Sequence, residues 1–133
     1  MDDEPLWLTS EDVAAIHTKE LEAFGGLPGI KDAGLVESAI ENPKTLFYYG
    51  GENDVLTLAV RLCWAIGKNH GFNDGNKRTA TAAMIMFLAM NGYDLIIPDD
   101  DPNNPLLAEW VERLVSGDYT QEQFADRLYH FIT

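Results

Sequence analysis

One short segment of the chain, His70 to Arg78, gathers the residues best suited to chemistry. It reads His-Gly-Phe-Asn-Asp-Gly-Asn-Lys-Arg. Gly75 lets the backbone approach a phosphate closely, while Lys77 adds a point charge and Arg78 a forked donor for phosphate oxygens. Asn76 can cap a following helix or contact a ligand. These residue types, at the start of a predicted helix, indicate an anion site, and phosphate is the expected anion.

Two further residues of the segment could act on a bound phosphate. Asp74 offers a hard oxygen ligand, which suits Mg²⁺ because this ion usually takes one or two carboxylates together with substrate phosphates. His70 carries the side chain of this segment that titrates near neutrality, so it is the candidate general base for a hydroxyl that attacks the phosphate. Phe72 is expected to anchor the loop to the core. Taken singly, each residue also fits a cap, a turn or a solvated surface.

The segment must be held between helices, and the capping residues, glycines and prolines of the chain predict six of them. They are expected at about residues 10–24, 32–41, 54–70, 76–91 and 104–116, and from residue 120 onward. The second helix is expected to end before Pro43. The fourth is apolar around most of its circumference, which predicts a buried helix. The expected fold is all-α: a compact bundle of about six helices around this buried central helix, in one domain over residues 1–133.

Other elements are expected to be minor. Residues 93–98 are predicted to form a short extended piece, so the fold has at most a small β-hairpin.

Trp7, Phe24, Trp64 and Phe87 are expected in the core. His17 is expected to be a core or capping histidine, and His130 a surface one. Tyr48 and Tyr49 could line a groove for a substrate or partner.

Composition and charge narrow the classes of function. Hydrophobic residues make up 46% and charged residues 23%, an ordinary globular balance, and the formal net charge is −13. Because nucleic-acid binding depends on basic residues, this charge disfavours DNA or RNA as a ligand. The longest strongly apolar run, residues 82–90, is far shorter than the ~20 residues of a membrane span. With the single Cys63, the chain is expected to be cytosolic and free of disulfides. The acidic runs at residues 2–4 and 99–101 are read as solvated surface.

The segment from His70 resembles the signature of the Fic/Doc (Fido) family, H-x-F-x-[D/E]-[A/G]-N-[K/G]-R, at every specified position. The stretch from Phe24 to Leu35, with the core Gly-Gly-Leu-Pro-Gly-Ile-Lys-Asp at residues 25–32, is similar to the N-terminal signature of the Doc (death-on-curing) branch. The resemblance covers roughly Ser10 to Gly92 and implies the Fic/Doc fold. It also implies ATP and Mg²⁺ as cofactors and assigns the site residues. These are His70 as base, Phe72 as anchor, Asp74 as metal ligand, and Gly75, Asn76, Lys77 and Arg78 as phosphate-binding residues.

The residue that follows Asn76 separates the two branches. Fic enzymes that transfer AMP read H-P-F-x-x-G-N-G-R-x-x-R, whereas this chain has Gly71, Lys77 and Thr81 where they have Pro, Gly and the last Arg. The resemblance to Doc implies a toxin that transfers the γ-phosphate of ATP to a threonine of a protein, elongation factor Tu. AMP transfer to protein hydroxyls is one alternative, and Lys77 tells against it. A non-catalytic module that binds nucleotide or a partner is the other, and the intact His70 and Asp74 tell against that.

The chain contains no self-inhibitory helix signature of the form [S/T]-x-x-x-E-[G/N]. Thr18 to Glu22 comes closest, but Ala23 follows where Gly or Asn is required. The resemblance therefore implies inhibition in trans, by a small Phd-like antitoxin that folds into a groove on this domain.

Overall fold

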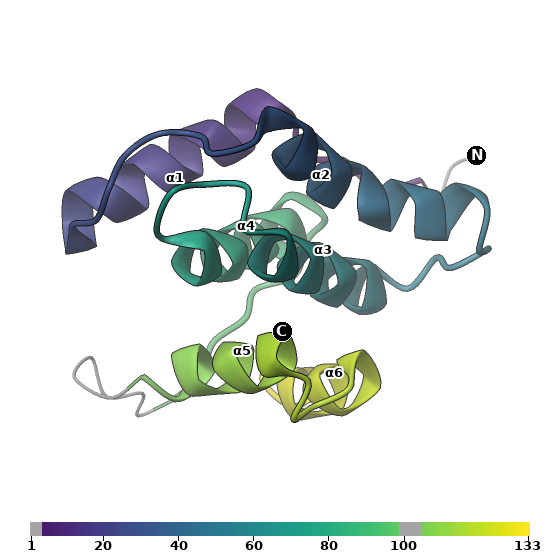
Figure 1. Ribbon diagram of the computed structural model, residues 1–133. Helices are drawn as coiled ribbons and strands as arrows, with labels where there is room; N and C mark the ends of the chain where they lie inside the picture. Colours follow the sequence, from purple (N-terminus) through teal and green to yellow (C-terminus); the bar gives the residue numbers. More distant parts are fainter. Residues whose placement is uncertain (1–3, 99–104) are drawn as a thin grey trace.

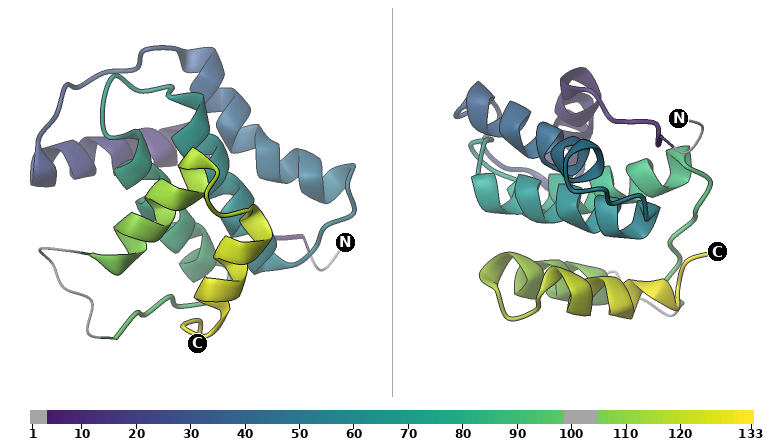
Figure 2. Two further views of the ribbon diagram at one scale, coloured as in Figure 1. Left: turned by 60° about the horizontal axis from the view of Figure 1, so that its bottom comes forward. Right: turned by 90° about the vertical axis from the view of Figure 1, so that its right-hand side faces the viewer.

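The computed structural model describes residues 4–98 and 105–133. Over these residues it contains the helices α1 (Ser10–Phe24), α2 (Ala33–Tyr48), α3 (Val55–Asn69), α4 (Asn76–Met90), α5 (Leu106–Ser116) and α6 (Gln121–Tyr129). They form three layers: α1 and α2 cover one side of the α3–α4 pair, and α5 and α6 cover the other (Figures 1 and 2). The expected all-α bundle is confirmed.

Local capping explains where most helices begin. Thr9 and Asp12 form a capping box at the start of α1, and Thr120 and Gln123 form another at the start of α6. Each box pairs two backbone N–H groups that would otherwise lack a partner. Asp32 caps α2 and Asp54 caps α3. The expected cap Asn104 lies outside the described residues, as do most of the acidic runs at 2–4 and 99–101; the described N-cap of α5 is Pro105.

The predicted end of the second helix is wrong. α2 continues through Pro43 to Tyr48, seven residues beyond the expected end at Glu41. Proline lacks an N–H, so the carbonyl of Ala39 loses its helical partner. Pro43, Ala39 and Ile40 are all buried on the side of α2 that packs along α3. Burial of this apolar face offsets the lost hydrogen bond.

The fourth helix lies in the middle layer, but its burial is less complete than expected. α4 buries one side, with Thr79, Ala80, Ala83, Met84, Phe87 and Leu88. Ile85 and Met86, however, are exposed. The middle layer is only two helices wide, so α4 contacts α1, α3 and α5 and keeps one uncovered flank. The more deeply buried helix of the pair is α3, with eight buried residues: Leu58, Ala59, Val60, Leu62, Cys63, Ala65, Ile66 and Gly67.

The remaining predictions about minor elements are mostly confirmed. Leu95 pairs with Ile132 in an isolated antiparallel bridge, which accounts for the extended piece at residues 93–98. Phe87 is buried and Trp7 stacks on it at 5.7 Å between ring centroids, but Phe24 is exposed, contrary to expectation.

Burial raises the pKa of the Cys63 thiol to about 12, so this cysteine is an inert core residue. No helix among the described residues is long and apolar enough to cross a membrane.

Candidate active site

Two loops far apart in the sequence lie side by side at the site. Residues 70–75 connect α3 to α4, and residues 25–32 connect α1 to α2. Ile30 and Phe72 form an antiparallel bridge. The Gly71 carbonyl accepts hydrogen bonds from the N–H groups of residues 31 and 32, at 2.9 and 3.0 Å. The two stretches that carry the family signatures are therefore one structural unit.

This pairing explains why glycine follows His70. A Cβ atom on Gly71 would lie 2.5 Å from Cγ2 and 2.9 Å from the backbone nitrogen of Val36, in the first turns of α2. No side chain fits without moving α2. The proline that Fic enzymes have at this place would meet the same obstacle.

Asp74 is held by backbone N–H groups from both loops. Its Oδ1 accepts from Gly75 N at 2.9 Å, and its Oδ2 accepts from Leu27 N at 3.3 Å. These two hydrogen bonds, followed by the positive charge of Arg78, lower the pKa of the Asp74 carboxyl. The side chain is therefore a carboxylate at neutral pH and fixed in place.

His17 supports the loop from α1. Its side chain is only 4% exposed, and its Nε2 lies 2.8 Å from the backbone oxygen of Asp74. A carbonyl oxygen can only accept, so Nε2 carries the hydrogen. The imidazole also stacks on Phe72, which is 2% exposed. The expected core histidine is confirmed. Its contact with Asp74 leaves no signal in the sequence, because the two residues are 57 positions apart.

His70 ends α3 in an unusual conformation. With φ 51° and ψ 46° it is the one non-glycine residue in the left-handed region among the described residues. A residue with a Cβ atom pays for this conformation, although histidine tolerates it better than most. The side chain is exposed and lines a hollow of about 350 Å³. Strain of this kind gathers at functional sites.

The hollow lies at the start of α4. Its lining residues all come from the motif: His70, Asn73, Asp74, Gly75, Asn76, Lys77 and Arg78. Gly75, with φ 73°, is the N-cap of α4, and no side chain caps this helix. Side chains cap α1, α2, α3 and α6, whereas α5, which follows Pro105, also has no side-chain cap. The N–H groups and the positive end of the α4 dipole are therefore available to an anion.

Asn76 has a different contact from the two that the sequence suggested. Its side-chain Oδ1 accepts from Phe72 N, and its Nδ2 donates to the Phe72 carbonyl, both at 3.0 Å. The amide thus closes the motif loop onto the first turn of α4 instead of capping that helix. A phosphate contact from Asn76 would have to come from its backbone N–H.

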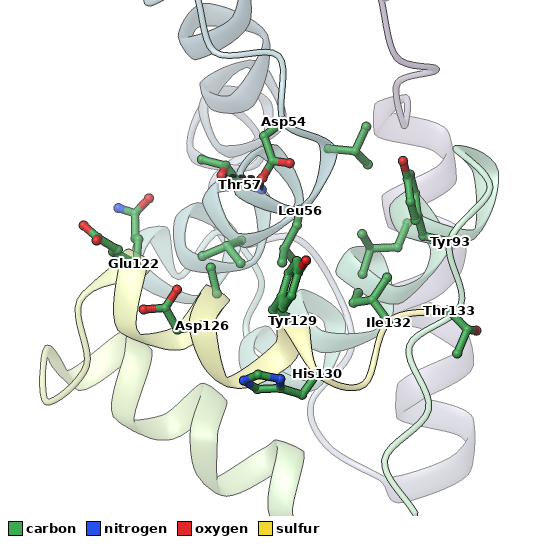
Figure 3. A pocket seen from close by; sticks show the side chains of 15 residues that line it. Asp54, Leu56, Thr57, Tyr93, Glu122, Asp126, Tyr129, His130, Ile132 and Thr133 are labelled. Atoms are coloured by element: carbon green, nitrogen blue, oxygen red, sulfur yellow. Dashed lines mark hydrogen bonds between the residues drawn. The ribbon is translucent and has the colours of Figure 1, made fainter.

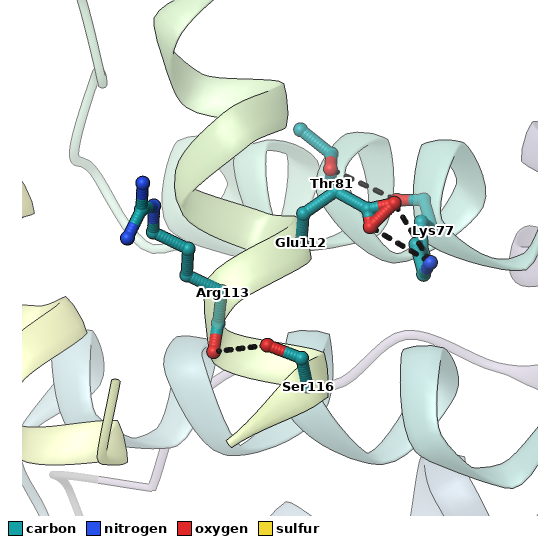
Figure 4. Close-up of polar contacts among 5 residues, drawn as sticks. All are labelled: Lys77, Thr81, Glu112, Arg113 and Ser116. Atoms are coloured by element: carbon teal, nitrogen blue, oxygen red, sulfur yellow. Dashed lines mark hydrogen bonds and ion pairs between the residues drawn. The ribbon is translucent and has the colours of Figure 1, made fainter. Parts of the chain in front are cut away.

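Both cations of the motif have partners within the chain. Arg78 donates to the Gly25 carbonyl at 2.9 Å and lies over the ring of Phe24. Lys77 Nζ lies 2.8 Å from each carboxylate oxygen of Glu112, on α5 (Figure 4). The Thr81 hydroxyl donates to the Lys77 carbonyl at 2.9 Å, so its hydrogen is used within the helix.

A larger hollow, of about 750 Å³, lies away from the motif (Figure 3). Residues of α3, α4 and α6 line it, among them Tyr129, together with Asp54, Tyr93 and His130, which lie just outside these helices. His130 is exposed, as expected. No residue of the motif reaches this hollow. The smaller hollow is therefore the candidate active site, because it brings the candidate base, metal ligand and anion donors together.

Comparisons with known proteins identify the family of the chain. The sequence model of the Fic/DOC family matches residues 7–88, which include both loops and the whole motif. The chain is 29% identical over 121 residues to a protein of Escherichia phage P1 named "Protein kinase doc", covering 91% of each chain. It is 37% identical over 90 residues to a protein of Mycolicibacterium smegmatis named "Toxin Doc", covering 67% of each chain.

Proposed function

The chain belongs to the Doc branch of the Fic/DOC family, and from this premise we propose that it is a toxin and an ATP-dependent protein kinase. It transfers the γ-phosphate of ATP to a hydroxyl of a protein. The observation that carries the proposal is the uncapped start of α4, which opens on a hollow shared by His70 and Asp74. A nucleotide phosphate placed there meets backbone donors, two cations and a candidate base at once.

The residues at the hollow fit a magnesium ion. Among the described residues there is no cluster of three or more acidic, histidine or cysteine ligands, which a protein-only metal site would need. Asp74 is nevertheless ionised and fixed beside the anion site. A single carboxylate with substrate phosphates is a common environment for Mg²⁺. When bound, the ion would neutralise phosphate charge and help to orient the triphosphate.

The chemistry then needs a proton acceptor and a fixed acceptor hydroxyl. His70 takes the proton of the attacking hydroxyl while the hydroxyl oxygen forms a bond to the γ-phosphorus. The bond between the γ-phosphorus and the bridging oxygen breaks, and ADP leaves with that electron pair. The backbone N–H groups of α4, with Arg78, stabilise the charge that spreads over the phosphate oxygens. Most of the catalysis comes from this placement.

Lys77 favours the γ-phosphate over the α-phosphate as the group transferred. Its side chain fills space at the start of α4 that a glycine would leave open, and it adds a full charge there. Thr81 adds no second cation one turn later, since its hydroxyl is bonded to the Lys77 carbonyl. The backbone N–H groups of α4 and Arg78 can then hold the triphosphate in the orientation that presents its γ-phosphate to the attacking hydroxyl.

The proposed target and the proposed inhibitor are supported by the resemblance of the motifs to the Doc branch. A threonine of elongation factor Tu is the proposed acceptor, and a small Phd-like antitoxin is the proposed inhibitor. Coexpression with the short gene beside this one should restore growth and give a complex on size exclusion. If no neighbouring product restores growth, inhibition in trans by such a partner is wrong.

Incubation with a bacterial lysate and γ-labelled ATP tests the function itself. The expected result is one main labelled protein that carries phosphothreonine, with no label when His70→Ala replaces the wild type. Label in the His70→Ala sample, or label in small molecules alone, would contradict the proposal.

A further inference from the structure

The ion pair between Lys77 and Glu112 connects the motif to a helix outside it. Lys77 is in the first turn of α4, and Glu112 is in the middle of α5, 35 residues later. Both carboxylate oxygens lie 2.8 Å from the ammonium nitrogen. The two side chains face each other across the gap between the helices (Figure 4).

Stability of the fold does not account for this pair. The side chains of Lys77 and Glu112 are 43% and 58% exposed, and exposed ion pairs contribute little to folding. Apolar residues already attach α5 to the bundle, among them Val111 and Leu114, which are almost completely buried. These neighbours also fix the backbone that carries Glu112.

The paired ammonium can still bind a phosphate. It has three N–H donors, and one carboxylate engages at most two of them through its two oxygens. Lys77 lines the hollow while it is paired. A free lysine moves on a flexible four-carbon stem, and the pair with Glu112, whose backbone is held in α5, restricts where its charge lies.

We propose that Glu112 is a positioning residue for phosphoryl transfer, which holds the Lys77 ammonium at the wall of the hollow so that its remaining N–H meets the nucleotide phosphates. This inference rests on the proposed function of the site. Without Glu112, Lys77 keeps its positive charge, but its ammonium group is no longer held at the wall of the hollow. Misplacement of this kind lowers the rate of reaction more than the affinity for ATP.

Glu112→Gln tests the inference, because it keeps the size of the side chain and removes its charge. Glu109→Gln is the matched control: Glu109 is on the same helix, is 50% exposed and pairs with Arg113 at 3.2 Å, away from the hollow. We expect kcat to fall about tenfold in Glu112→Gln, with KM for ATP within about threefold, and neither to change in the control. An unchanged or higher kcat in Glu112→Gln, or equal losses in both variants, would overturn the proposal.

A double-mutant cycle asks whether Glu112 acts through Lys77. Adding Glu112→Gln to Lys77→Ala should cause no further loss of kcat, because the group that Glu112 positions is already gone. Independent, multiplicative losses would mean that Glu112 acts in another way.

Failure of this inference can be told apart from failure of the kinase proposal. If label comes from the α-phosphate, the kinase proposal fails, and the same variants are compared on AMP transfer. If no label is transferred, NMR of the lysine ammonium groups decides. In the wild type and in Glu109→Gln, the Lys77 ammonium signal should be protected from hydrogen exchange, and its chemical shift should change when ATP and Mg²⁺ are added. In Glu112→Gln the signal should lose this protection. Equal protection in all three proteins would overturn the role of Glu112.

Discussion

The imidazole of His17 lies flat against the ring of Phe72, with ring centroids 3.9 Å apart and the ring planes at 12°. The same imidazole donates to the Asp74 carbonyl. One side chain of α1 therefore contacts both the buried residue of the motif loop and the backbone of its metal-ligand candidate. Part of the support of the motif loop therefore comes from outside the motif.

Replacement of His17 by alanine should destabilise the protein. It leaves the Asp74 carbonyl without its partner, which costs about 1–3 kcal/mol, and it removes the ring that covers Phe72. Urea unfolding measures the loss. His130→Ala, at an exposed histidine, is the control and should stay within about 0.5 kcal/mol of the wild type. Equal midpoints for His17→Ala and the wild type would show that the stacked pair contributes nothing.

Replacement of His70 by glycine should separate stability from activity. Glycine adopts the left-handed conformation without strain, so the free energy of unfolding should rise by about 1 kcal/mol. Loss of the general base should lower transfer by about 10²–10⁴-fold, and toxicity should disappear with it. Thermal unfolding and γ-labelled ATP measure the two effects.

His130→Gly provides the control for this change. His130 has φ −71° in the right-handed region, so glycine there should lower stability and leave transfer intact. A His70→Gly protein that still arrests growth at wild-type expression would mean that His70 is not the base, or that toxicity needs no catalysis.

Asp74→Asn should remove the dependence of ATP binding on magnesium. Asparagine still accepts a hydrogen bond through its side-chain oxygen, so it disturbs the loop less than alanine would, but it is a poor ligand for Mg²⁺. Calorimetry with ATP, with and without Mg²⁺, measures the effect. Asp54→Asn, at the N-cap of α3, is the matched control and should keep the magnesium effect. Unchanged magnesium dependence in Asp74→Asn would discard the ligand assignment.

The contribution of Asp74 to stability should be lost only in acid. Its pKa lies below the ordinary 3.8, chiefly because Gly75 N–H and Leu27 N–H bond to the charged form. A group with a lowered folded pKa stabilises the protein above its unfolded pKa, and this effect disappears as pH falls through the folded value. The difference in urea midpoint between wild type and Asp74→Asn should therefore be constant from about pH 5 to 8 and shrink below about pH 4. A difference that changes across neutral pH would contradict this assignment.

Local signals in the sequence predicted the elements well. The Thr120–Gln123 capping box satisfies its own hydrogen bonds within four residues, so the start of α6 could be predicted without knowledge of the fold. The end of α2 could not, because its passage through Pro43 depends on burial against α3. The exposed flank of α4 depends in the same way on how many helices share its layer.

The motif residues could be found from the sequence, but their partners could not. Types and spacing grouped His70, Asp74 and the two cations in one segment, residues 70–78, and the structure places them around one hollow. His17 and Glu112 have no pattern that links them to this loop. A single sequence does not say which distant residues meet, and these contacts span 57 and 35 positions.

The identity of the transferred phosphate tests the central claim most directly. The purified protein is incubated with a bacterial lysate in two parallel samples. One sample contains ATP labelled at the α-phosphate, and the other contains ATP labelled at the γ-phosphate. Because Lys77 occupies the start of α4 and Thr81 supplies no second cation, label should pass to protein from the γ position alone, and Lys77→Gly should lower it. Label that passes to protein from the α position would contradict the kinase and establish AMP transfer.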